Sequence, residues 1–261
     1  NDPSDQYARI YSDDVILAIN SLELPRYGLG KHIDPTKLVN TTKQEHVLLD
    51  NLAKAGPRLK GFSRTNLFKR LESSGKVFLD SVKRHILRNY IFLYAIENGL
   101  PLPIGTQDAL LLDTRENDED VEQQYFFDNP AMDEFADEML EKQDDNTINE
   151  ELLSQEEFRK KAAHVYQLYA IQYHNRFNWI RSDYFLNNLT IELQMDALTL
   201  IGVLRKCGEW DWQKDTKFET LYDLISNKHS HEKVLIFTQF ADSVRYIEDC
   251  LRKKGVAHVE G

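Results

Sequence analysis

The sequence predicts a mainly helical protein whose end, residues 231–261, changes to a strand–helix–strand pattern. Three observations support this fold class: capping boxes at several helix starts, apolar residues recurring every three or four positions, and one continuous apolar run near the end of the chain. With 261 residues and 41% hydrophobic content, the chain is long enough to bury a core.

Capping boxes predict where three of the helices start. In this arrangement a Ser or Thr hydroxyl accepts a hydrogen bond from the backbone three residues on, and a Glu at that position bonds back to the first residue. The pairs are Thr42 with Glu45, Ser154 with Glu157, and Thr216 with Glu219.

Two long helices follow from the spacing of apolar residues. After Ser154 the spacing predicts a helix of about six turns with one core-facing stripe, made of Phe158, Ala162, Val165, Tyr169 and Tyr173. A second helix is predicted from about residue 182 to residue 206, where Gly208 then ends it. Its buried side comprises Leu186, Leu189, Leu193, Leu200, Ile201 and Leu204.

The apolar run at residues 233–237 is typical of a strand covered on both faces of a parallel sheet. A helix then follows, marked by Val244, Ile247 and Leu251. Gly255 is placed to cap that helix, and residues 256–259 begin a further strand. One such unit cannot form a stable sheet, so we expect the chain to be an internal segment of a longer protein.

The charge is unevenly distributed along the chain. The net charge is −11, but the segment from Asp113 to Glu151 holds 16 of the 43 acidic residues, against only Arg115 and Lys142. The rest of the chain is faintly basic. Residues 113–150 therefore predict a solvated surface insert, with a weak helix near residues 132–140. The sharper alternative is an acidic strip that mimics DNA or inhibits a basic face.

Several functional classes find no support in the sequence. No apolar run reaches the roughly 20 residues needed to cross a bilayer, and the start lacks a signal-peptide pattern, so a cytoplasmic location is expected. Cys207 and Cys250 lack zinc-site spacing and are expected to be buried free thiols. The stretch Gly28-Leu29-Gly30-Lys31-His32 lacks the spacing of a phosphate-binding loop.

The stretch Ile236-Phe237-Thr238-Gln239-Phe240, with Lys233-Val234-Leu235 before it and Ala241-Asp242-Ser243 after it, is the most specific in the chain. It resembles motif IV of Swi/Snf-type superfamily 2 ATPases, which opens their second RecA-like lobe. Upstream, Trp210-Asp211-Trp212-Gln213-Lys214-Asp215-Thr216-Lys217 resembles the helix that leads into that lobe. The stretch at residues 61–75, continued over residues 84–105, resembles a segment between the two lobes in bacterial members.

The resemblance implies a helical insertion followed by the truncated β-α-β start of a RecA-like lobe. The expected organisation is a helical inter-lobe segment at 1–112, the acidic insert at 113–150, a long-helix segment at 151–230 and the start of the second lobe at 231–261. The implied parent protein is an ATP-dependent DNA translocase of the bacterial nucleoid, with the missing RecA-like lobes on the same chain. ATP and magnesium belong to that parent, since the motifs that hold them do not occur in this sequence, and we expect no cofactor and no ATPase activity here.

Nine Lys or Arg residues lie between Arg58 and Arg88, against only Glu72 and Asp80, and we term this stretch the basic segment. Within it Lys76, Arg84 and Arg88 share one helical face, which predicts a surface that tracks DNA phosphates without recognising sequence. The alternative is that this face is solvated, or packs against the acidic insert or the ATPase lobe.

The candidate DNA-contacting residues form two sets. The basic segment contributes Arg64, Lys69, Arg70, Lys76, Lys83, Arg84 and Arg88. The resemblance adds Thr238 and Gln239, whose hydroxyl and amide would donate to phosphate, although they could equally cap the next helix.

Two rival functions stay open. One is a helical protein-interaction or structural module that does not bind DNA, which the acidic insert and the absence of catalytic motifs support. The other is an RNA-directed superfamily 2 helicase, which shares the lobe architecture. Salt-dependent affinity for double-stranded DNA separates the first rival from a DNA translocase.

Overall fold

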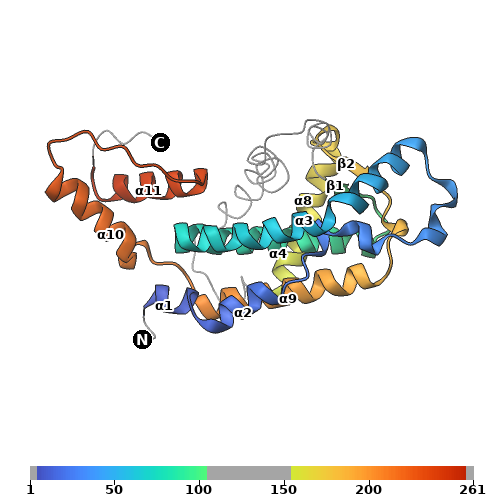
Figure 1. Ribbon diagram of the computed structural model, residues 1–261, viewed down its shortest axis with the longest axis horizontal. Coiled ribbons are helices and arrows are strands. Elements are labelled where there is room, and N and C mark those ends of the chain that lie inside the picture. Colours follow the sequence, from blue (N-terminus) through green and yellow to red (C-terminus); the bar gives the residue numbers. More distant parts are fainter. Residues whose placement is uncertain (1–4, 105–153, 257–261) are drawn as a thin grey trace.

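The computed structural model describes residues 5–104 and 154–256, and these residues are mainly helical, as predicted (Figure 1). The acidic insert and the predicted second strand at 257–259 lie outside the described residues. The helices are α1 (Gln6–Ile10), α2 (Asp13–Ser21), α3 (Lys43–Ser73), α4 (Gly75–Glu97), α8 (Gln155–Ile171), α9 (Asn188–Cys207), α10 (Thr216–Asp223) and α11 (Ala241–Lys253).

Helix α4 is the centre of the fold. Most of its residues from Gly75 to Ala95 are buried, and a helix with so much apolar surface is stable only when its neighbours cover it. Helices α3, α8 and α9 pack along it, and α2 packs against α9. The fully buried side chains on α4 include Phe78, Val82, Ile86, Leu87 and Leu93. We term this assembly of α1–α4, α8 and α9 the bundle.

A short antiparallel ribbon, which the sequence analysis did not predict, lies beside the bundle. Strand β1 (Leu102–Ile104) pairs with β2 (Asn178–Ile180), with Leu102 opposite Ile180. Both strands have only three residues, and so short a segment shows no alternating pattern that sequence analysis can detect. The ribbon connects the end of the α4 segment to the segment that precedes α9.

The predicted helix after Ser154 is confirmed as α8. The Ser154 hydroxyl accepts a hydrogen bond from the Glu157 backbone at 3.2 Å, and the predicted stripe is buried as far as Tyr169. The helix is shorter than predicted, because it ends at Ile171 and leaves Tyr173 outside. The capping box at Thr42 and Glu45 is confirmed in full at the start of α3.

The second long helix begins later than predicted. Helix α9 starts at Asn188, because residues 178–184 form strand β2 and a single 3₁₀ turn instead. Leu186 therefore lies outside the helix and is exposed, whereas the other predicted core leucines are buried. The helix ends at Gly208, whose φ of 68° is a left-handed conformation that favours glycine.

The capping box predicted at Thr216 is wrong by one residue. Asp215 is the N-cap of α10, and its carboxylate accepts from the Phe218 backbone N–H at 3.0 Å. Asp and Thr are both good N-cap residues, so the pattern alone did not distinguish them. The other contacts of Asp215, described below, favour Asp at this position.

The end of the chain is partly as predicted. Helix α11 is confirmed, and Gly255 follows it with a φ of 81°. The predicted strand at residues 233–237 is wrong: this segment is not a strand, and Leu235 and Phe237 are 82% and 91% exposed. A buried parallel strand needs strands beside it and layers on both faces, and the described residues supply neither here.

Buried apolar residues form two separate clusters. The main cluster fills the bundle and runs from Ile10 to Cys207. The second is small, built on Phe218, Cys250 and Leu251 between α10 and α11, and we term α10, α11 and residues 224–240 the C-terminal unit. This unit lies beyond the end of α4 at which Gly75 stands (Figure 1). No helix of the described residues is long and apolar enough to span a membrane.

Gly75, between the bundle and the C-terminal unit, is required by its neighbour Trp210. A Cβ at residue 75 would lie 2.1 Å from the Trp210 ring. We expect Gly75→Ala to lower the free energy of unfolding by about 1–3 kcal/mol, because the indole must shift. The measurement is urea unfolding followed by circular dichroism.

Gly61, in α3, is the matched control, since a Cβ there meets no atom within 4 Å. Gly61→Ala is expected to leave stability unchanged or to raise it by about 0.5–1 kcal/mol, through helix propensity. Equal losses in both variants would contradict the role assigned to the Trp210 contact.

Candidate interface between the bundle and the C-terminal unit

Two arginines of the basic segment meet one carboxylate of the C-terminal unit. Arg70 Nη1, near the end of α3, and Arg84 Nη2, on α4, donate to Asp242 Oδ2 at 2.7 and 2.6 Å. Arg70 and Arg84 are only 5% and 4% exposed. Asp242 lies in the first turn of α11, where the helix dipole also favours a negative charge.

The charges at this contact depend on one another. Burial alone would raise the pKa of Asp242, but the guanidinium groups of Arg84 and Arg70 outweigh it and hold the pKa below its ordinary value. Removing one member of a buried ion pair leaves the other charge without compensation, which costs about 3–5 kcal/mol. The contact therefore fixes α11 against the bundle.

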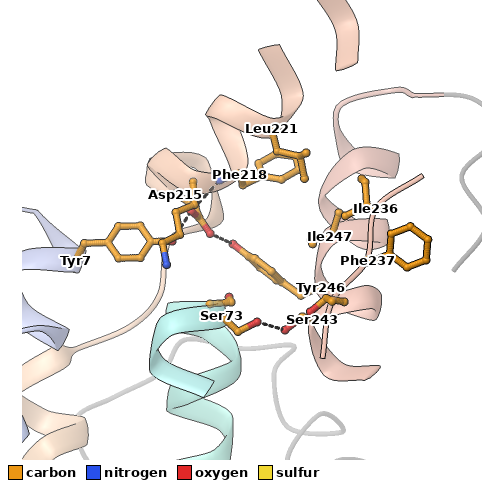
Figure 2. A pocket seen from close by; sticks show the side chains of 13 residues that line it. Tyr7, Ser73, Asp215, Phe218, Leu221, Ile236, Phe237, Ser243, Tyr246 and Ile247 are labelled. Carbon is orange, nitrogen blue, oxygen red and sulfur yellow. Dashed lines mark hydrogen bonds between the residues drawn. The ribbon is translucent and has the colours of Figure 1, made fainter. Parts of the chain in front are cut away.

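Further contacts surround Asp242. The Arg70 guanidinium lies 4.6 Å from the centre of the Phe240 ring, a cation–π contact. The hydroxyls of Ser73 and Ser243 are 2.7 Å apart and share a hydrogen bond (Figure 2). Contacts at Phe240, Asp242 and Ser243 thus bind the start of α11 to the end of α3 and to α4.

A second polar network centres on Asp215, which is 1% exposed. Its carboxylate accepts hydrogen bonds from Tyr7 Oη and Tyr246 Oη, each at 2.7 Å, besides capping α10. Trp210 Nε1 donates to Tyr246 Oη at 2.9 Å. Burial, and then the bond to Asp215, raises the pKa of both phenols, so they stay protonated donors. This network joins α1, α10 and α11.

A pocket of about 250 Å³ lies between these two networks. Its walls come from α1, from the α3–α4 connection, from α10, from residues 236–238 and from α11 (Figure 2). Phe218, Leu221 and Ile247 make one side apolar, while hydroxyls such as that of Thr238 line the rest. We refer to the two networks and this pocket together as the junction.

The structure divides the predicted DNA-contacting residues into two groups. Buried in the protein are Arg70, Arg84 and Arg88. Gln239 is exposed, and the partly exposed residues are Arg64, Lys69, Lys76, Lys83 and Thr238. Arg64 Nη2 donates to the Leu22 carbonyl at 2.6 Å, and Lys76 Nζ lies 2.7 Å from the Asp80 carboxylate.

The prediction of an exposed face of Lys76, Arg84 and Arg88 is therefore wrong for the two arginines. Neighbouring elements bury Arg84 and Arg88, whereas the Lys76 side chain is 41% exposed. Burial first, and then the guanidiniums of Arg26 and Arg88, lowers the pKa of nearby His85 well below its ordinary value. The positive charge of Arg84 and Arg88 is thus held inside the protein, and Arg84 lies at the junction.

The glycine-rich stretch at 28–32 has a packing role. A Cβ at Gly30 would lie 2.4 Å from the Ala53 Cα, so glycine allows this segment to approach the α3 backbone. His32 is buried, with its Nδ1 3.0 Å from Asn188 Oδ1 on α9. Both contacts attach the stretch to the bundle.

Sequence analysis missed the acidic and aromatic members of the junction. Asp242 stands inside the motif IV-like stretch, and Asp215 immediately precedes the predicted helix start, but neither was assigned a contact. An aspartate at an N-cap or in a first helical turn can be recognised from the local sequence. The partner of Asp215, Tyr7, and the partner of Asp242, Arg70, are distant in sequence and are brought close only by the tertiary fold.

No group of three or more His, Cys, Asp or Glu side chains that could hold a metal ion occurs among residues 5–104 and 154–256. Cys207 and Cys250 are buried free thiols, as predicted. Comparison with family models, with curated proteins and with solved structures finds no significant match to this chain. The contacts of the junction are therefore the basis for a functional proposal.

The Asp215 network is expected to be a main support of the C-terminal unit. Asp215→Ala removes a helix cap and the acceptor of two half-buried phenols, which should cost about 3 kcal/mol. Asp211→Ala is the control, because Asp211 caps only a short turn and its side chain is 41% exposed. It should cost less than about 1 kcal/mol. Urea unfolding measures both, and similar losses would contradict the central role of Asp215.

The Asp242 contact predicts a pH dependence. Because the folded pKa is depressed, the stabilisation is complete well above the ordinary Asp pKa of about 3.9 and is lost as pH falls through the folded value. At neutral pH, Asp242→Asn should lower the free energy of unfolding by about 3 kcal/mol. The difference from the unchanged protein should shrink below about pH 4. Urea unfolding at several pH values tests this, and a gap independent of pH would argue against an ionic contact.

Proposed function

We propose that this chain is the helical inter-lobe segment, with the start of the second lobe, of a Swi/Snf-like DNA translocase. The observation that supports this most is the contact of Arg70 and Arg84 with Asp242. It joins the two stretches that resemble the family, one at residues 61–105 and the other at 209–261. A contact between two segments so far apart in sequence is what we expect if the helical insertion is mechanically coupled to the second lobe.

In this proposal the chain transmits movement and does not perform the chemistry. The start of α11 is attached to α3 and α4 by an ion pair, a cation–π contact and a hydroxyl pair. A lobe connected to α11 would therefore move the bundle, or be held by it. ATP hydrolysis, with its magnesium, belongs to the complete two-lobe parent.

In this proposal the more accessible lysines of the basic segment contact the DNA. Lys76 and Lys83 are seven residues apart on α4, which places them on one face, and Lys69 lies near the end of α3. The Lys76 side chain is 41% exposed. Lysine is a flexible point charge that suits sequence-independent contact with phosphates.

The second candidate function is a helical protein-interaction module without DNA binding. The uncovered apolar residues Leu235 and Phe237 favour it, because large exposed hydrophobic side chains mark surfaces that another protein covers. On this view the buried arginines serve only the fold. The two proposals differ in whether the protein binds duplex DNA.

The test is binding to a short fluorescent duplex across a salt series. The unchanged protein is expected to bind at low salt, with an affinity that falls steeply between about 50 and 200 mM salt. The triple variant Lys69→Gln, Lys76→Gln, Lys83→Gln should bind at least about tenfold more weakly, with a salt slope reduced by about 2–3. Fewer phosphate contacts mean that fewer counterions are released from the DNA on binding.

The matched control is Lys37→Gln, Lys160→Gln, Lys214→Gln, three exposed lysines on other elements. It removes the same charge and should change the affinity little. Equal weakening in both triples would mean non-specific attraction only. No binding of the unchanged protein at low salt would favour the interaction module.

A further inference from the structure

We propose that Arg70 and Arg84 form a phosphate-binding site that Asp242 occupies when the junction is closed. The Asp242 carboxylate then competes with the phosphate groups of DNA for the same two guanidiniums. This inference rests on the proposed function for its biological ligand, but the site itself is defined by the geometry of the junction.

The geometry resembles recognition of an oxyanion. Two guanidinium groups, from two different helices, converge on the single oxygen Oδ2 of Asp242. Arginine forks bind carboxylates and phosphates through the same charge-assisted bonds, and a DNA phosphodiester, like a carboxylate, presents two charged oxygens. A group that replaced Asp242 would therefore meet donors already placed for it.

The surroundings hold these donors in position. Arg84 Nη2 also lies 3.2 Å from Ser81 Oγ, one turn earlier on α4. The Ser73 hydroxyl is close by, since its partner Ser243 follows Asp242 directly. Buried, prearranged arginines lose little freedom on binding, which strengthens a site of this kind.

The junction is also built to separate. The main hydrophobic cluster belongs to the bundle and the small one to the C-terminal unit. The contacts at the start of α11 that join them are polar or cation–π, and the pocket of about 250 Å³ leaves space between the two parts. Polar contacts can exchange for contacts with water or a ligand, whereas a continuous apolar core cannot. Movement of α11 would expose both arginines at once.

The first experiment compares Asp242→Asn with Asp249→Asn, an exposed aspartate on the same helix that gives an identical change in net charge. The probes are the fluorescent duplex and inorganic tripolyphosphate. Asp242→Asn is expected to bind both at least about fivefold more tightly than the unchanged protein, because the internal competitor is lost. Asp249→Asn should remain within about twofold.

The second experiment keeps every charge in place. Ser73→Cys with Ser243→Cys puts two thiols where the hydroxyl oxygens are 2.7 Å apart, so that a disulfide can lock the junction. The native cysteines are buried and are not expected to compete. Oxidation should lower the affinity for tripolyphosphate at least about fivefold, and reduction should restore it. The single variant Ser243→Cys, treated identically, should not respond to oxidation.

The outcomes separate this inference from the proposed function. Binding of tripolyphosphate that is lost on locking, without any binding of DNA, supports the phosphate site and contradicts the DNA translocase proposal. Binding of DNA by the unchanged protein that neither Asp242→Asn nor locking alters supports the lysine face and overturns the phosphate site. If Asp242→Asn does not fold, the locked and reduced forms still decide the question.

Discussion

The burial of most of α4 is the constraint on which the rest of the structure depends. The face that carries Lys76 and Lys83 stays partly accessible, and α3, α8 and α9 pack along the helix. The same burial encloses Arg84 and Arg88, whose charges must then be compensated within the protein. Packing of one central helix thus creates a demand for an internal anion beside Arg84, and Asp242 supplies it.

That demand explains why the C-terminal unit sits where it does. Hydrophobic contacts are compatible with many arrangements of two units. Few arrangements allow two guanidiniums to share the Asp242 carboxylate while two phenols share the Asp215 carboxylate. The positions of Arg70 and Tyr246, which belong to different elements, are therefore linked through Asp242 and Asp215. Polar networks of this kind set the orientation of the C-terminal unit and also contribute to its stability.

Periodicity and capping predicted much of the fold, because those signals are local. Helices α8 and α11 follow from the spacing of their apolar residues, and Gly208 ends α9 as expected. The buried state of Arg84 could not be predicted in this way, since a face with two arginines suggests solvent until the covering elements are known. The strand expected at 233–237 failed for a related reason: its pattern specifies burial, but not the neighbours that provide it.

The small apolar cluster of the C-terminal unit has an energetic consequence of its own. Within the part of the chain that the structure describes, its buried residues are Phe218, Cys250 and Leu251, with half-buried neighbours such as Tyr222 and Ile247, which is too little to offset the entropy of ordering two helices. The folded state of α10 and α11 must then depend on their contacts with the bundle. When α11 leaves the bundle, the result should resemble local melting more than the swing of a rigid arm. A partner surface that covered Leu235 and Phe237 would stabilise the folded α10 and α11. It would thereby favour the contact of Asp242 with the arginines without touching them.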